Sequence, residues 1–295
     1  MAQSFPRIKI GQFSESPVLA VARGLGLDSR YGLSWVTDRV ASSPGQFESL
    51  RNGEYDLVVT SPDNVLLYAT TDANPLKEKI NLRLLRPIDR GLGLALYTSR
   101  DIEHPTDFIG CTLGVDVMSS GFALLLLRML EELGVEDSSI SFKPVGATPK
   151  RLVAITEGDI SGSILNAETA VAAEAAGLKK WSSSVDVSDH YLGTVLCQMA
   201  GPVSDSTRAF LDMWEEATGI ILASAPESLV EVFSESAPAL ATKAYVDLLQ
   251  SSDFGCIAGE EITIDALTVL ADIRAAAHAY TPNEQQIKDL LDSSR

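Results

Sequence analysis

The chain has 295 residues, of which 45% are hydrophobic, and a formal net charge of −17. This length is large for a single hydrophobic core and fits two lobes. The acidic balance argues against nucleic acid as a partner, because that binding depends on Lys and Arg side chains that neutralise phosphates. It also disfavours anionic membrane surfaces. A net charge of this size favours solubility.

The sequence contains no long apolar segment. No run reaches the roughly 18 residues of a membrane-spanning helix, so no membrane insertion is expected. The opening MAQSFPRIKIGQF leads almost directly into a strand, without a charged segment followed by an apolar one. No signal peptide is therefore predicted. The simplest expectation is a cytoplasmic protein, and a periplasmic or extracellular location applies if the chain is a processed form.

The cysteines and histidines show no ligand spacing. Three cysteines lie far apart in the sequence, so neither a disulfide framework nor a zinc site is predicted. Cys197, within the apolar run TVLCQM, is expected to be a buried thiol. The three histidines lack a partner at i,i+4, and no complete nucleotide-binding glycine motif is present. We therefore expect neither a metal nor a cofactor.

The first hundred residues alternate between strand and helix patterns. Apolar alternation and short apolar runs predict strands at 7–13, 33–40 and 55–61, with helices at 17–26, 43–51 and 62–69. The helix at 43–51 starts with a predicted capping box from Ser43 to Gln46. This order implies a parallel sheet with right-handed crossovers. The stretch 81–99 is β-like, and its Gly-Leu-Gly-Leu section suits a strand that leaves one sheet and enters another.

A second block repeats this plan before the chain becomes helical. Strands are expected at 111–117, 140–146 and 161–166, and helices at 120–133, 148–157 and 168–177. Residues 191–200 are predicted to return as a strand to the first lobe, and the chain from 204 onward is helical. The polar tail after Pro282 is expected to fray.

Four predicted helices begin with a hydroxyl residue followed by proline. These junctions are Ser16-Pro17, Ser43-Pro44, Ser61-Pro62 and Thr148-Pro149. A hydroxyl caps free N–H groups, and proline fits the first helical position because its missing N–H needs no partner. In an open α/β sheet such turns gather at the carboxyl ends of the strands, where ligands bind. The sequence thus predicts a cleft for a small polar ligand.

The sequence of these elements resembles that of a known protein family over roughly residues 7–200. The matching segments are IKIGQFSESPVLAVARGLGL, QFESLRNGEYDLVVTSPDNVLLYA, DFIGCTLGVDVMSSGFALLLLRMLEELGV and RLVAITEGDISGSIL. They include a Leu-x-x-Gly-Glu-x-Asp-Leu step at 50–57 and a Gly-x-x-x-Gly-Val-Asp strand at 110–116. The chain resembles the type II periplasmic-binding-protein fold, in the branch of alkanesulfonate, nitrate and thiamine-pyrimidine-precursor binding proteins.

The resemblance implies an α/β fold of two βα lobes joined by a two-strand hinge, with C-terminal helices. Lobe I is expected to comprise 1–92 and 197–295, and lobe II 93–196. Closure is expected to bend the chain near 90–93 and 192–195. The family includes receptors of ABC transporters, so a transporter permease is an expected partner if the chain is exported. Related members are enzymes, among them desulfinases, decarboxylases and pyrimidine synthases.

Short polar side chains near the predicted strand ends form the candidate binding site. Beside open helix N–H groups they can hold a carboxylate, sulfonate or phosphate. The alternative for each hydroxyl is that it only caps its helix. The candidates are Ser14, Glu15, Ser16, Ser42, Ser43, Ser61, Asn64, Arg90, Asp116, Ser119, Ser120, Thr148, Asn166 and Glu168.

The charged candidates narrow the chemical class of the expected ligand. Glu15, Asp116 and Glu168 would repel a simple anion, and they suit a ligand with an amine or a heterocyclic N–H. Arg90 is a candidate counter-charge or carboxylate clamp, and its alternative is a surface pair with Asp89.

The preferred function is a solute-binding protein for a small polar organic molecule, such as a sulfonate, a carboxylate or a pyrimidine-like compound. The alternative is a cytosolic enzyme on the same scaffold, of the desulfinase, decarboxylase or pyrimidine-metabolism type, with Glu15, Glu168 and His190 as acid/base candidates. The cysteine-rich motif of the pyrimidine synthases is absent, and Cys111 stands at a strand start, which disfavours a nucleophilic role. A ligand-sensing regulatory module is a third possibility.

Overall fold

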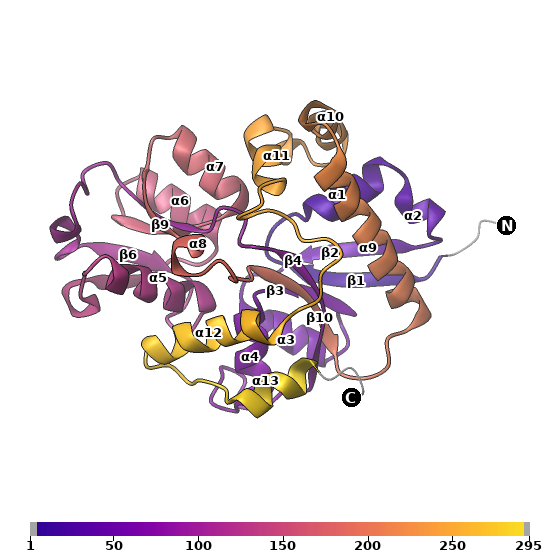
Figure 1. The fold of residues 1–295 in the computed structure, drawn as a ribbon, viewed down its shortest axis with the longest axis horizontal. Coiled ribbons are helices and arrows are strands. Elements are labelled where there is room, and N and C mark those ends of the chain that lie inside the picture. Colours follow the sequence, from indigo (N-terminus) through magenta and orange to yellow (C-terminus); the bar gives the residue numbers. More distant parts are fainter. Residues whose placement is uncertain (1–4, 292–295) are drawn as a thin grey trace.

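The computed structural model describes residues 5–291, which form two five-stranded sheets (Figure 1). The first sheet has the order β2-β1-β3-β10-β4. Its strands are β1 (Arg7–Gln12), β2 (Ser34–Arg39), β3 (Leu57–Thr60), β4 (Leu82–Asp89) and β10 (Thr194–Met199). The helices between its first four strands are α1 (Pro17–Gly24), α2 (Leu27–Arg30), α3 (Ser43–Arg51) and α4 (Pro62–Thr70). β1 pairs in parallel with β2 and β3, which confirms the predicted β-α-β-α-β order.

The second sheet repeats this plan with the order β7-β6-β8-β5-β9. Its strands are β5 (Ala95–Thr98), β6 (Thr112–Val115), β7 (Ser141–Pro144), β8 (Gly162–Leu165) and β9 (Lys179–Ser183). Its helices are η1 (Pro105–Phe108), α5 (Gly121–Glu132), η2 (Asp137–Ser139), α6 (Thr148–Thr156), α7 (Ala167–Ala175) and α8 (Ser184–Val187). β6 is parallel to β7 and β8, whereas β5 is antiparallel to β8 and β9.

Helices follow β10 and contact both halves of the molecule. They are α9 (Asp205–Ala223), α10 (Pro226–Ser236), η3 (Pro238–Leu240), α11 (Lys243–Leu249), α12 (Ile264–Ala276) and α13 (Glu284–Leu291). α9 and α10 pack on α1, α11 touches α10 and α7, and α12 lies against α4 and α5 (Figure 1). The prediction of a fraying tail after Pro282 was wrong, because α13 buries Ile287 and Leu290.

The predicted long β stretch at 81–99 is two strands separated by a turn. β4 ends at Asp89 in the first sheet, and β5 begins at Ala95 in the second. Between them Gly91, Leu92 and Gly93 adopt positive φ values of 110°, 45° and 73°, a conformation that glycine accepts without a steric penalty. The chain returns to the first sheet through β10, which crosses the predicted lobe boundary at 196/197. The lobe boundaries stay a prediction, and their outer limits at residues 1 and 295 lie outside the described residues.

Two of the four predicted hydroxyl-proline junctions are N-caps as expected. Ser16 Oγ accepts from the N–H of Leu19, and Ser61 Oγ accepts from that of Asp63. At the other two junctions the predicted hydroxyl is the first helical residue and not the N-cap, because the N-cap of α3 is Ser42 and that of α6 is Ala147.

The predicted capping box at the start of α3 is also wrong. Gln46 turns inward and donates to the carbonyls of Gly11 and Val59, so that it ties the helix to the sheet. Here the need of buried strand carbonyls for a donor outweighs the capping pattern.

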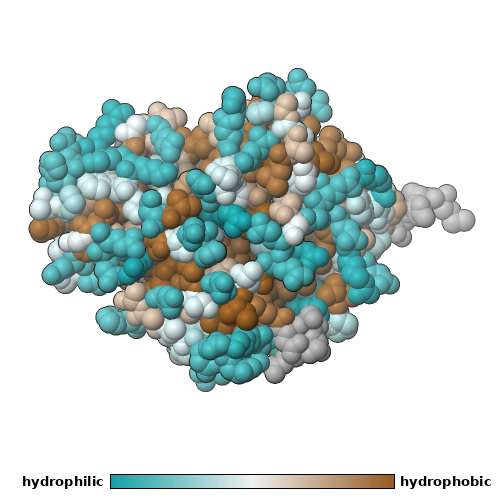
Figure 2. Space-filling model, in the orientation of Figure 1, coloured by the Kyte–Doolittle hydropathy of each residue, from teal (hydrophilic) through white to brown (hydrophobic). Residues whose placement is uncertain are grey.

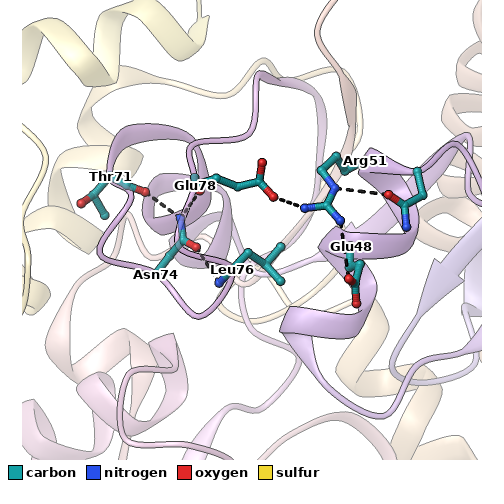
Figure 3. Close-up of polar contacts among 7 residues, drawn as sticks. Glu48, Arg51, Thr71, Asn74, Leu76 and Glu78 are labelled. Carbon is teal, nitrogen blue, oxygen red and sulfur yellow. Dashed lines mark hydrogen bonds and ion pairs between the residues drawn. The ribbon is translucent and has the colours of Figure 1, made fainter.

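The far end of α3 is fixed by a polar network shown in Figure 3. Asn74 donates from Nδ2 to the carbonyls of Thr71 and Glu78, both at 2.6 Å, and accepts from the N–H of Leu76 at 2.8 Å. Arg51, the last residue of α3, pairs with the Glu78 carboxylate. The loop after α4 therefore holds the carboxyl end of α3, while the opposite end of this helix faces the cavity described below.

The hydrophobic core is continuous between the two sheets on the side of α4, α5 and α12. One buried cluster includes Val58 and Val65 from the first half, Leu113 and Leu125 from the second, and Leu267 of α12. In the face drawn in Figure 2, hydrophobic residues gather towards the middle of the molecule, and hydrophilic ones cover much of its periphery.

Candidate functional site

A cavity of about 130 Å³ lies between the two sheets. Its lining comes from loops and helix starts at the carboxyl ends of strands in both halves. From the first half and β10 come Phe13, Ser14, Ala41, Ser43, Val59, Thr60, Ser61, Asn64 and Thr194. From the second come Asp116, Ser120, Gly121, Phe122, Ala147, Thr148, Pro149, Arg151 and Asn166. Strand ends of this kind are where α/β folds place ligands.

Five helices begin at the cavity wall. Ser43, Ser61 and Ser120 stand at the starts of α3, α4 and α5, and Thr148 and Asn166 at those of α6 and α7. Free N–H groups and the positive ends of the helix dipoles favour a negatively charged or acceptor-rich guest.

The cap hydroxyls at this wall also accept hydrogen bonds from the first N–H groups of their helices. Ser61 Oγ accepts from the N–H of Asp63 at 3.3 Å, and Ser120 Oγ accepts from that of Ala123 at 3.3 Å. A hydroxyl that accepts one bond still has its own proton to donate, so capping and ligand contact are compatible.

Eight of the sequence-predicted site residues line the cavity. They are Ser14, Ser43, Ser61, Asn64, Asp116, Ser120, Thr148 and Asn166. The other candidates lie outside this lining: Ser16 and Ser42 cap α1 and α3, and Ser119 is exposed. Arg90 donates to both carboxylate oxygens of Glu260, at 2.7 and 2.9 Å, so neither the clamp nor the Asp89 pair is what this conformation shows.

The candidate acid/base residues do not meet in the cavity. Glu15 and Glu168 do not line it, although burial raises the pKa of Glu168 and the Glu15 carboxylate adds to that rise. The nearby Arg39 guanidinium opposes the shift. His190 has a side chain that is 65% exposed and lies 3.7 Å from the exposed carboxylate of Asp189.

Sequence reasoning missed Arg151, the cationic residue of the cavity wall. It lies in the first turn of α6, three residues after Thr148, and is only 4% exposed. Its Nη1 donates to Ser163 Oγ at 3.3 Å, and Ser163 in turn donates to the carbonyl of Gly114 at 2.7 Å. The i,i+3 spacing places Thr148 and Arg151 on one face of the helix, which is the signal that was available.

The Arg151 guanidinium is incompletely paired. Its Nε has no hydrogen-bond partner among the described residues, and none of their ion pairs includes it. Burial lowers its pKa to about 10, and the Asp116 carboxylate works against that shift. Burying a charged group without a counter-ion is costly, so a cation left in this state is suited to an incoming negative group.

Asp116 follows β6 directly and is the anionic residue of the wall. Burial raises its pKa, and the Arg151 guanidinium lowers it. The remaining lining is largely apolar or hydroxylic, with Phe13 and Phe122 as its aromatic members. The cavity thus offers one positive group, one negative group, several hydroxyls and an apolar wall.

None of the residues that line the cavity is a cysteine or a histidine. Cys197 is buried, as predicted, and burial raises its pKa to about 12. In the described part of the chain, no group of three His, Cys, Asp or Glu side chains is arranged to hold a metal. Residues 5–291 also contain no helix with the length and apolar character needed to span a bilayer.

The fold matches solved structures along nearly the whole chain. The alkanesulfonate-binding protein SsuA from Xanthomonas axonopodis pv. citri, bound to MOPS, aligns with a TM-score of 0.74 at 14% identity, covering 97% of this chain and 98% of that one. The periplasmic aliphatic sulphonate binding protein SsuA from Escherichia coli aligns with a TM-score of 0.70 at 16% identity, covering 97% and 91%. A mutant of DszB in complex with biphenyl-2-sulfinic acid aligns with a TM-score of 0.66 at 14% identity, covering 99% and 96%.

No family model and no curated protein matches the sequence. At these identities the structural matches define the fold alone. The chain has the type II periplasmic-binding-protein fold, an α/β architecture of two sheets with helices packed around them.

Proposed function

We propose that this chain is a solute-binding protein that holds a small polar organic molecule, such as a sulfonate, a carboxylate or a pyrimidine-like compound, between its two lobes. The observation that carries the proposal is the meeting of five helix N-termini from both halves at one cavity. Each N-terminus offers unpaired N–H groups, and together they form a site rich in donors. The eight predicted residues that line the cavity are the proposed ligand contacts, together with Arg151.

The two-lobed plan supports capture by closure. The polypeptide crosses between the sheets at 90–94 and again before β10, and hinge motions of packed lobes bend a few such connecting residues. Structures with this fold include SsuA proteins that bind sulfonates, which supports the same kind of role here. A periplasmic location and an ABC transporter permease as partner are the corollaries of that role.

An enzyme on the same scaffold is the second candidate. It is favoured by Glu168, a half-buried carboxylate whose pKa is raised by burial and by the neighbouring Glu15. A carboxyl group with a raised pKa can take or give a proton nearer to neutral pH. DszB in complex with biphenyl-2-sulfinic acid shows the same fold around a different kind of guest.

A ligand screen with a chemical readout separates these functions. The protein is incubated with a library of small acids, amines, amino acids and pyrimidines, and thermal stabilisation identifies the compounds that bind. Proton NMR then follows each binding compound over several hours. Binding without chemical change supports a solute-binding protein, conversion to a new compound supports an enzyme, and stabilisation that survives Ala41→Trp in the cavity wall would place the ligand elsewhere.

A further inference from the structure

The cavity contains two ionisable side chains of opposite charge, Asp116 and Arg151. Both come from the second half, Asp116 from the end of β6 and Arg151 from the first turn of α6. They influence each other's pKa, yet they are not among the pairs within 4.0 Å of each other. The wall therefore presents a separated positive and negative charge with a net charge of zero.

Arg151 is built as a fixed anion site. Its stem lies under β6, since a Cβ added to Gly114 would be 3.6 Å from Arg151 Cγ. Ser163 holds one end of the fork, whereas Nε remains without a partner inside the described protein. A guanidinium that is held in place, desolvated and partly unpaired is suited to bind a carboxylate or sulfonate through two parallel bonds.

Asp116 determines which charged group the other end of the ligand must carry. A simple anion bound to Arg151 would leave the half-buried Asp116 carboxylate uncompensated inside a closed cleft. Glu15 and Glu168 are close in sequence to the lining residues Ser14 and Asn166, and their two negative charges face the single positive charge of the nearby Arg39. A simple amine would instead leave Arg151 uncompensated. A guest with both charges satisfies both residues.

We propose that the solute is a zwitterion, with an acidic group bound by Arg151, an ammonium group facing Asp116 and an apolar body between Phe13 and Phe122. This inference rests on the proposed function and names the solute class of the same cavity. The presence of Arg151 and Asp116 in the cavity wall supports the contacts with the acidic and ammonium groups, and the aromatic lining supports the contact with the apolar body. Aromatic walls bury an apolar body and tolerate a nearby cation on their faces.

The test uses matched trios that differ by one charged group. The probes are L-phenylalanine, 3-phenylpropanoate and 2-phenylethylamine; β-alanine, propanoate and propylamine; and taurine, ethanesulfonate and ethylamine. Dissociation constants are measured by calorimetry on the full chain. In at least one trio the zwitterion is expected to bind about 10- to 100-fold more tightly than either single-charge analogue, the range of one charge-assisted hydrogen bond. Equal or tighter binding of an acid or amine in every trio overturns the proposal, and so does a protein that binds none of the nine.

Two variants, each of which removes one charge, test which residue binds which charged end of the zwitterion. Asp116→Asn is expected to abolish the advantage of the zwitterion over the acid, and Arg151→Gln its advantage over the amine. Arg151→Lys, which keeps the charge and loses the fork, should retain part of that second advantage and guards against a folding defect in Arg151→Gln. Advantages that survive both charge-removing variants overturn the proposal. The proposed function fails separately, if the ligand screen finds no compound that binds in the cavity.

Discussion

Asp89 and Thr194 are joined by a side-chain hydrogen bond that ties together the two chain segments connecting the sheets. Thr194 Oγ1 donates to Asp89 Oδ2, and Gly91 N–H donates to Oδ1 at 2.7 Å. The Asp89 carbonyl also accepts from the N–H of Gly193 at 2.9 Å. One buried carboxylate thus holds the outgoing turn at 90–94 and the first residue of the returning β10. It is the natural place to test how the two halves are held together.

The pH dependence of stability should report on Asp89. Burial raises the pKa of this carboxyl group from 3.8 to about 6. The folded protein then holds the proton more tightly than the unfolded chain, so the contribution of this group is present at low pH and is lost as pH rises through about 6. Relative to Asp89→Asn, the free energy of unfolding of the wild type should be higher at pH 5 than at pH 7.5 by about 1.4 kcal/mol.

Urea unfolding of the two proteins at both pH values measures this difference. Asp72→Asn, at an exposed position in the loop after α4, provides the matched control for replacing an aspartate. A wild-type advantage over Asp89→Asn that is the same at pH 5 and pH 7.5 would show that Asp89 does not titrate in this range.

Gly193 should be intolerant of a side chain. A Cβ atom there would lie 2.5 Å from the Gly91 backbone and would also meet the Asp89 carboxylate. We expect Gly193→Ala to destabilise the protein by about 1–3 kcal/mol, as overpacking does. The control is Gly219→Ala, inside α9, where a Cβ has open space and should stabilise by about 0.5–1 kcal/mol. Thermal unfolding of both variants checks that the two substitutions change stability in opposite directions. An unchanged unfolding midpoint for Gly193→Ala would contradict the close approach of Gly193 to Gly91.

The ion pair between Arg274 and Asp63 should be important for stability. Arg274 Nη1 lies 2.8 Å from Asp63 Oδ2, both side chains are at most 3% exposed, and the contact joins α12 to α4. Arg274→Met leaves the carboxylate buried without its partner, so we expect a loss of about 3–5 kcal/mol in denaturant unfolding. Lys243→Met breaks the exposed pair with Asp247 and should cost less than about 0.5 kcal/mol. Similar losses in the two variants would refute the distinction.

The serine caps provide a test that separates stability from binding. Ser120 caps α5 at the cavity, whereas Ser204 caps α9 and does not line it. Replacement of either by alanine should lower the free energy of unfolding by about 1 kcal/mol. Only Ser120→Ala should also weaken binding of the compound found in the ligand screen. Equal affinities in the two variants would mean that the Ser120 hydroxyl has no role beyond capping.

Local signals in the sequence predict most of this fold. The N-caps at Ser16 and Ser61 were predictable because the hydroxyl, the proline and the apolar strand before them act within a few residues. The same reasoning failed for β9, whose sequence KKWSS has no clear strand pattern. Tertiary contacts specify this strand: Trp181 donates to Thr98 at 2.9 Å and packs edge-on against Phe108.

The candidate site, like the fold, was predictable from the sequence only where local signals determine it. Hydroxyls at helix starts were predictable because the fold gathers strand ends at one edge. Arg151 was missed because arginine is mostly exposed in proteins, and only the packing of α6 on β6 and β8 buries it. Arg90 was selected for its place beside the crossing, yet its partner Glu260 lies 170 residues away in the sequence. Pairings at that separation are decided by the folded structure.

Native mass spectrometry of the freshly purified protein is the direct test of whether a solute is captured between the lobes. The wild type is compared with Ala41→Trp, which places a bulky side chain at the cavity wall, and with Ala225→Trp, a control at an exposed alanine outside the cavity lining. We expect the wild type and Ala225→Trp to carry one small molecule per chain and Ala41→Trp to carry none. A small molecule retained equally by all three proteins, or absent from the wild type, would contradict this expectation.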